Sequence, residues 1–184
     1  MSGDPRDELV DHLPALRAFA ISLTRNGATA DDMVQDTVVK AWTNIDKFEP
    51  GTNMRAWLFT ILRNTFYSSR RKAKREVADV DGIFTENMAE KPAHDGHLQM
   101  ADFMRAFAKL PDEQRETLTL VGASGFSYEE AAVMCDVAVG TIKSRANRGR
   151  KRLAELMNLD ADGPVELTDK ATVAVVSNNG NSSF

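Results

Sequence analysis

The sequence of 184 residues predicts an all-α protein with two small helical domains joined by a flexible acidic linker. Apolar residues recur at three- and four-residue steps through most of the chain, which is the spacing of one helix face. The alternation of apolar and polar residues that is typical of β-strands is absent. The helical period stops between residues 77 and 97, where acids, two glycines and a proline indicate a linker.

The expected domain limits follow from this pattern. The first domain covers residues 1–76, the linker covers 77–97, and the second domain covers 98–159. The remaining residues, 160–184, end in SNNGNSSF and are expected to form a disordered tail.

Three helices are expected in the first domain. Pro14 marks a break or a first turn of the first helix, because proline has no N–H to donate. Residues 29–32 (TADD) indicate a capping box at the start of the second helix, and residues 48–53 form a turn-rich loop before the third. Trp42 and Trp57 fall on the apolar faces and are expected in the core. The three faces comprise Leu9, Leu13, Leu16, Ala20 and Leu23; Val34, Val38, Ala41, Trp42 and Ile45; and Met54, Trp57, Leu58, Ile61, Leu62 and Phe66.

The second domain is expected to hold four helices. Met100, Phe103, Met104 and Phe107 give the first, which ends near Leu110. The second opens at Pro111, with acids in its first turn. Residues 127–130 (SYEE) are a capping box that starts the third helix, and the turn 136–138 leads into the fourth.

Positive charge is concentrated in two segments of an acidic chain. The formal net charge is −4, but residues 52–76 and 139–152 each carry +6, so the rest of the chain carries −16. This segregation is typical of a protein that binds a polyanion, and nucleic acid is the favoured partner. A pair of merely solvated helix faces is the simpler alternative.

The last predicted helix separates an apolar side from a cationic one. On a helical wheel, Ile142, Ala146, Gly149, Leu153 and Leu156 fall on the inner side. The opposite side mixes long cations with short polar groups, which suits a helix in a DNA groove. With the capped helix and short turn before it, the segment forms a helix-turn-helix. The outward side comprises Gly140, Ser144, Asn147, Arg148 and Lys151, flanked by Thr141 and Lys143.

Three segments in order resemble the extracytoplasmic-function sigma factors, the group IV members of the sigma-70 family. GFSYEEAAVMCDVAVGTIKSRANRGRKRL is similar to their region 4, ADDMVQDTVVKAW to region 2.2, and NMRAWLFTILRNTFYSSRRKAKRE to regions 2.3 and 2.4. RRKAKREVADVDG and LVGASGFSYEEAA are similar to the general-stress, EcfG-like branch. The resemblance covers residues 9–159.

The resemblance implies a set of partners. A sigma factor binds core RNA polymerase through the β′ clamp helices and the β flap and directs it to promoter DNA. In the general-stress branch a NepR-like anti-sigma factor holds it inactive, under the control of a PhyR-like response regulator. The positions that match the clamp-helix contacts are Asp32, Gln35 and Asp36.

The resemblance also assigns the two cationic segments. The first would engage the melted −10 element, with one base flipped into a pocket beside the loop 48–53. The matching positions there are Asn53, Arg63, Asn64, Arg70, Arg71 and Lys74. The second would bind the −35 element in duplex form, largely through DNA shape. Its positions are Thr141, Lys143, Ser144, Asn147, Arg148 and Lys151.

Other functions and sites remain open alternatives at this point. A helix-turn-helix repressor or activator would need a dimer interface or ligand domain, and no homo-oligomer is expected. No phosphate loop, nucleophile–base pair or metal cluster recommends an enzyme, a catalytic residue or a cofactor. His94 and His97 with Asp95 are interpreted as solvated linker residues, not as metal ligands.

Composition favours a cytoplasmic protein without membrane contact. Hydrophobic residues make up 42% of the chain, and no apolar run approaches the roughly 20 residues of a spanning helix. The acidic N-terminus is not a secretory signal. The single cysteine, Cys135, cannot form an internal disulfide and is expected to be a buried apolar residue.

Overall fold

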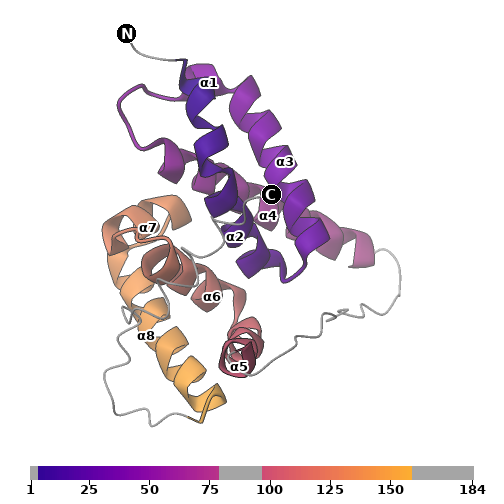
Figure 1. Ribbon diagram of the computed structural model, residues 1–184, viewed down its shortest axis with the longest axis vertical. Helices are drawn as coiled ribbons and strands as arrows, with labels where there is room; N and C mark the ends of the chain where they lie inside the picture. The colour runs from indigo at the N-terminus through magenta and orange to yellow at the C-terminus, as the bar shows by residue number, and fades with distance from the viewer. Residues whose placement is uncertain (1–3, 79–96, 159–184) are drawn as a thin grey trace. The chain divides into compact units, whose positions relative to one another are not determined.

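The computed structural model describes residues 4–78 and 97–158 (Figure 1). All regular elements in these two ranges are helical, as predicted, and the chain divides into two units at residues 90 and 91. The predicted tail, 160–184, and residues 79–96 of the predicted linker lie outside the described ranges.

The first unit is built on three long helices. A short helix α1 (Pro5–Glu8) and a 3-10 turn η1 (Val10–His12) lead into α2 (Leu13–Thr24). Helix α3 (Gly27–Thr43), a turn η2 (Ile45–Lys47) and α4 (Met54–Ala78) follow. Helices α2, α3 and α4 pack against one another in pairs (Figure 1).

The core of the first unit is mostly aliphatic with one aromatic pair. The rings of Phe19 on α2 and Phe59 on α4 stack with centroids 4.7 Å apart. Leu16 and Leu23 on α2 and Leu62 on α4 are fully buried. Pro14 lies in the first turn of α2, where a missing N–H costs nothing, as the sequence predicted.

Helix α3 begins earlier than predicted and has a different N-cap. The Asn26 side-chain oxygen accepts the Thr29 backbone N–H at 2.9 Å, so the capping box predicted at residues 29–32 is wrong. Asn26 has extended backbone angles that suit an N-cap, while Arg25 closes α2 in the left-handed region with φ 59°.

This cap makes a direct prediction. We expect Asn26→Ala to lower the free energy of unfolding of the first unit by about 1 kcal/mol, because it removes the acceptor of one orphan N–H. Thr29→Ala is the matched control and should change it by only a few tenths, since Thr29 is exposed inside the helix. Urea unfolding followed by tryptophan fluorescence measures both; a larger loss in Thr29→Ala would restore the predicted capping box.

In the second unit, the described residues 97–158 form four α-helices and a π-helical turn. Helices α5 (His97–Ala108) and α6 (Asp112–Leu118) are followed by the turn η3 (Thr119–Ala123), α7 (Tyr128–Cys135) and α8 (Val139–Leu156). Helix α8 packs on α5, α6 and α7 (Figure 1). Cys135 is buried, as predicted.

Small residues let α8 lie close to its neighbours. The core of this unit contains Ala106, Leu110, Leu118, Ala146 and Leu153. At Gly149 an added Cβ would lie 3.0 Å from Leu118 Cδ1 and 3.3 Å from Gln114 Cβ. The inward glycine therefore sets the approach of α8 to α6, as the helical wheel predicted.

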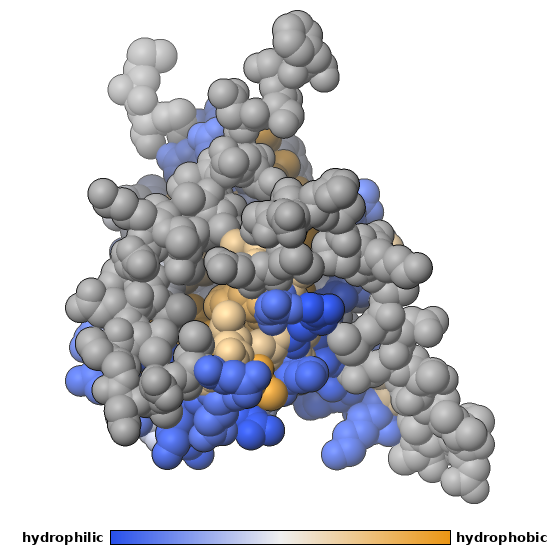
Figure 2. Space-filling view, turned by 60° about the horizontal axis from the view of Figure 1, so that its bottom comes forward, coloured by the Kyte–Doolittle hydropathy of each residue, from blue (hydrophilic) through white to orange (hydrophobic). Residues whose placement is uncertain are grey.

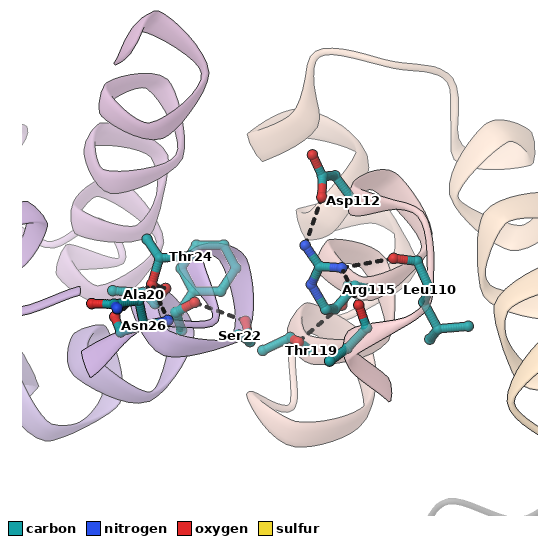
Figure 3. A network of polar contacts seen from close by, with 10 residues as sticks. Ala20, Ser22, Thr24, Asn26, Leu110, Asp112, Arg115 and Thr119 are labelled. Atoms are coloured by element: carbon teal, nitrogen blue, oxygen red, sulfur yellow. Dashed lines mark hydrogen bonds and ion pairs between the residues drawn. The ribbon is translucent and has the colours of Figure 1, made fainter. Parts of the chain in front are cut away.

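A buried arginine joins the start of α6 to the end of α5. Arg115 is 1% exposed, and its guanidinium donates to the Leu110 carbonyl at 2.7 Å and to Asp112 Oδ1 at 2.6 Å (Figure 3). The Thr119 hydroxyl donates back to the Arg115 carbonyl at 2.9 Å. Buried charges are stable only with such partners.

Candidate nucleic-acid interface

The helix-turn-helix has the predicted geometry. Ser127 Oγ accepts the Glu130 backbone N–H at 3.0 Å, and the Glu130 carboxylate accepts the Ser127 N–H at 2.8 Å, which confirms the capping box on α7. Asp136 ends α7 in the left-handed region with φ 54°. The chain then turns directly into α8.

The outward face of α8 carries the residues that the wheel placed there. Ile142, Ala146, Gly149 and Leu153 are buried, as the periodicity required. The exposed set mixes amide, hydroxyl and cationic groups, while Thr141 is half-buried at its edge. The exposed members are Lys143, Ser144, Asn147, Arg148 and Lys151.

The long helix α4 holds several cations against aromatic rings. The Arg63 guanidinium lies 4.7 Å from the Tyr67 ring centroid, and that of Arg70 lies 5.6 Å from the Phe66 ring. Arg71 donates to Ser68 Oγ at 3.1 Å. Lys74 is exposed further along the same helix. These rings fix guanidinium groups along a helix that the sequence marks as a cationic segment.

A hollow of about 340 Å³, lined by both polar and apolar groups, opens between the end of α3, η2 and α4. A relay of hydrogen bonds runs along its wall: Lys47 donates to Asn44 at 2.6 Å, Asn44 to the Lys40 carbonyl at 2.8 Å, and Lys40 to Thr65 at 2.9 Å. Trp57 and Ile61 supply apolar wall, and Asn64 and Ser68 supply further polar atoms.

The exposed face of α3 is acidic at one end and apolar at the other. Asp32, Gln35 and Asp36 are exposed. Val39 and Trp42 continue this face at 64% and 55% exposure. The prediction that Trp42 belongs to the core is therefore wrong.

The burial of α3 is shifted by one position from the predicted stripe. Its buried residues are Ala30, Met33, Thr37 and Ala41. Thr37 can be buried because its hydroxyl donates to the Met33 carbonyl at 2.8 Å. Val34 and Val38 are only half-buried at the border of the face.

Helix α1 supplies a partner for the exposed indole. The Arg6 guanidinium lies 5.1 Å from the ring of Trp42. Asp4 holds this arginine at 3.3 Å. The Arg6 backbone N–H donates to the Asp4 carboxylate at 2.9 Å and holds the pKa of that carboxyl below its ordinary value.

Comparison with known proteins decides the family. The Sigma-70 region 2 family matches residues 9–76, and Sigma-70, region 4 matches residues 100–153. The ECF RNA polymerase sigma factor EcfG of Rhodopseudomonas palustris (strain TIE-1) is 51% identical over 178 residues, covering 95% of this chain and 96% of its own length. The chain is an extracytoplasmic-function sigma factor of the EcfG-like branch.

Solved structures agree with this assignment. The sigma factor RpoE of Bartonella quintana, in complex with the anti-sigma factor NepR, is 55% identical, covers 86% of this chain and 99% of its own, and gives a TM-score of 0.78. The NMR structure of the PhyRSL–NepR complex from Sphingomonas sp. Fr1 matches at 22% identity, 85% and 90% coverage and a TM-score of 0.62. At that identity the second match shows the fold alone.

The family removes two of the earlier alternatives. Sigma factors are not enzymes, so the enzyme hypothesis is wrong for this chain. Matches to both region 2 and region 4 also explain the first cationic segment, which a repressor or activator would leave unexplained. Every residue predicted for the −10 element or polymerase lies within the region 2 match, and every −35 residue lies within the region 4 match.

The structure brings only some of the predicted −10 residues together. Asn64 lines the hollow of this sigma factor, but Asn53 does not; the Asn53 side-chain oxygen accepts the Ala56 N–H at 3.0 Å at the start of α4. Sequence reasoning missed Lys40, Asn44 and Lys47. No local pattern signalled them, because Lys40 lies in α3, Asn44 follows its last residue and Lys47 lies in the turn η2.

Among residues 4–78 and 97–158, no group of histidine, cysteine and acidic side chains could hold a metal ion. His94 and Asp95 lie outside these residues. None of the described helices is long and apolar enough to cross a membrane.

Hydrophilic side chains border apolar ones on the molecular face drawn in Figure 2. Five large apolar side chains are exposed in the described ranges: Val10, Val39, Trp42, Met104 and Val133. Val39 and Trp42 share one helix face and so form the clearest apolar patch of the first unit.

Proposed function

We propose that α8 of this sigma factor reads the −35 element as duplex DNA in the major groove. The observation that carries the proposal is the outward face of α8, which combines exposed Lys143, Arg148 and Lys151 with Ser144 and Asn147. Cations bind phosphates, while the amide and hydroxyl groups can bond base edges. Thr141 lies at the rim of this face.

The experiment that tests this function is multi-round transcription. Purified core RNA polymerase is incubated with fragmented DNA from the source cell, with and without the protein. We expect new discrete transcripts that share −35 and −10 sequences only when the protein is present. No new transcript, or new transcripts that share a −10 sequence but no −35 sequence, would contradict the proposal.

Arg148 gives the sharpest prediction for α8. It is exposed, and its Nε donates only a long bond of 3.4 Å to the Ser144 carbonyl. We expect Arg148→Ala to weaken −35 duplex binding by about 1–3 kcal/mol. Arg152→Ala is the matched control, because Arg152 pairs with Glu155 at 3.3 Å near the end of α8. Equal affinities of both variants and wild type in a duplex titration would remove Arg148 from the interface.

For the −10 element we propose that α4 and the hollow act together on melted DNA. The aromatic-backed arginines Arg63 and Arg70, with Arg71 and Lys74, would bind phosphates. The hollow has an apolar wall against which a base could stack and polar groups for its edge, which suits an extruded base. Asn53 would act indirectly, by fixing the start of α4.

Asn64 tests the hollow. We expect Asn64→Ala to lower the yield of open complexes about fivefold to tenfold, because a base would lose a side-chain hydrogen-bond partner. Affinity for a −35 duplex should not change. Ser69→Ala, an exposed α4 position that does not line the hollow, serves as control. Permanganate footprinting of a promoter found by the transcription experiment measures the open complex; an unchanged footprint would contradict the assignment.

For polymerase binding we propose the exposed acidic end of α3, formed by Asp32, Gln35 and Asp36, as the surface for the β′ clamp helices, with the β flap as a second polymerase contact. Helix α3 begins at Gly27 and has no acid in its first turn, so a favourable interaction with the helix dipole does not account for Asp32 and Asp36. The protein would then act in the cytoplasm, as sigma factors do.

We further propose control by a NepR-like anti-sigma factor. The support is the Bartonella quintana RpoE, 55% identical to this chain, which was solved in complex with NepR. A PhyR-like response regulator would release the inhibitor and so switch on general stress-response genes. Addition of a purified NepR-like protein should abolish the new transcripts, and a PhyR-like protein should restore them.

A further inference from the structure

Two of the six cationic side chains of α8 contact neighbouring helices of the same unit. Arg145 is 14% exposed, and its NH2 group lies 3.0 Å from Glu113 Oε1. Arg150 is half-buried, and both its terminal nitrogens donate to the Tyr128 hydroxyl at 3.3 Å. Lys143 and Lys151, in contrast, are exposed and have no ion-pair partner among the residues that the structure describes.

The two inward arginines connect α8 to two different helices. Glu113 lies in the first turn of α6, and Tyr128 is the first residue of α7. Each link therefore fixes α8 to the N-terminal end of one of the helices on which it packs. Glu113 and Arg145 are 32 positions apart in the chain, and Tyr128 and Arg150 are 22 apart, so both links are tertiary.

The links lie on opposite flanks of the outward face. At about 100° per residue, Arg145 and Arg150 point to either side of the line through Ser144 and Arg148. A rotation of α8 about its own axis would lengthen one link or the other. The apolar contacts of Ile142 and Leu153 resist separation of the helices, but apolar packing is less directional than these polar links.

We propose that Glu113 and Tyr128 are positioning residues, which act through Arg145 and Arg150 to fix the rotation of α8 and so decide which side chains meet the bases. Arg145 and Arg150 then belong to the framework and not to the phosphate contacts. This inference rests on the proposed DNA-binding role of α8.

Arg145 could either bind a phosphate or link α8 to Glu113. The change in DNA affinity caused by Glu113→Gln has a different sign for these two roles. If Arg145 bound a phosphate, Glu113→Gln would leave DNA binding unchanged or strengthen it, because an acid near DNA is lost. If Glu113 positions α8, the same change weakens binding of the cognate sequence by about threefold to tenfold. Glu129→Gln removes the same charge from the exposed first turn of α7 and is the matched control.

The experiment uses the full chain and a short duplex that the wild-type protein selects from a random library. Affinity for this duplex and for a scrambled duplex is measured by fluorescence anisotropy, and the thermal midpoint of each variant is recorded. We expect Glu113→Gln and Tyr128→Phe to lose affinity for the selected duplex only, with unchanged midpoints. A loss through unfolding would lower affinity for both duplexes.

Salt dependence supplies the second readout. A lost phosphate contact lowers the salt slope of binding by about one, whereas a lost positioning contact does not. We therefore expect unchanged slopes for Arg145→Gln and Arg150→Gln. Lower salt slopes for Arg145→Gln and Arg150→Gln, or wild-type affinity in Glu113→Gln, would overturn the positioning role. The DNA-binding role of α8 would stand. A wild-type chain that selects no duplex overturns the DNA-binding role of α8 together with this inference.

Discussion

Replacing Arg115 by alanine is expected to lower the free energy of unfolding of the second unit by about 3–5 kcal/mol. The substitution leaves the Leu110 carbonyl and the Asp112 carboxylate without the guanidinium that now bonds both, and it leaves a cavity where a buried side chain lay. A loss of about 3–5 kcal/mol is a large part of the total stability of a small domain, so the variant should lose −35 binding as well.

The two tryptophans make the measurement selective. Trp42 and Trp57 both lie in the first unit, so tryptophan fluorescence follows that unit while far-UV circular dichroism follows both. Arg115→Ala should lower the dichroism midpoint in urea and leave the fluorescence midpoint in place. The control is Arg105→Ala, because Arg105 is exposed and paired only with exposed Asp102. Equal dichroism curves for the two variants would contradict the role of Arg115.

Phe59→Ala is expected to lower the free energy of unfolding of the first unit by a similar amount, about 3–5 kcal/mol. Phe59 is 1% exposed and stacks on Phe19, so the substitution removes the central contact between α2 and α4. The Arg55 guanidinium, 5.3 Å from the Phe59 ring centroid, would lose this ring as well. A close-packed core refills such a cavity only in part.

This variant should give the opposite pattern to Arg115→Ala. The fluorescence midpoint should fall, and transcription should be lost because the surfaces of α3 and α4 depend on this core. Binding of a −35 duplex should persist. Val10→Ala, at 66% exposure, is the control and should change stability by less than about 0.5 kcal/mol. A Phe59→Ala variant as stable as this control would show that α2 and α4 are held by other contacts.

The sequence predicted the buried and exposed faces best for the helix with one clear apolar periodicity. Helix α8 has apolar residues at regular steps, so Ile142, Ala146, Gly149 and Leu153 could be assigned to its buried face; Ala154, outside this predicted set, is buried as well. The capping box at Ser127 is also a local device, because its hydrogen bonds join residues three apart.

Helix α3 shows why the same reasoning failed elsewhere. Val34, Val38, Val39 and Trp42 offer apolar residues on more than one side, and hydrophobicity alone favours the larger side chains. The close packing of three helices instead buries small Ala30 and Ala41, with Thr37 satisfied by the backbone. The prediction of its cap failed for a different reason: it was based on TADD alone, whereas the N-cap of the helix is Asn26.

The hollow could not be predicted from periodicity, because it is assembled from three elements. Lys40 comes from α3, Lys47 from η2, and Asn64 from α4. Their approach depends on the crossing of the helices, which a single sequence does not encode in any local pattern. The resemblance to sigma factors implied a pocket near the loop 48–53, but not which lysines line it.

Gly149 has a consequence for how variants of this protein would be scored in a genetic selection. Any side chain there would place its Cβ 3.0 Å from Leu118 Cδ1 and 3.3 Å from Gln114 Cβ, so either these side chains or α8 must shift by a few tenths of an ångström to hold it. A selection for altered promoter preference should therefore recover changes at a buried position that never touches a base. In a map of tolerated substitutions, Gly149 would be grouped with the specificity-determining residues, although it acts only through how closely α8 packs on α6.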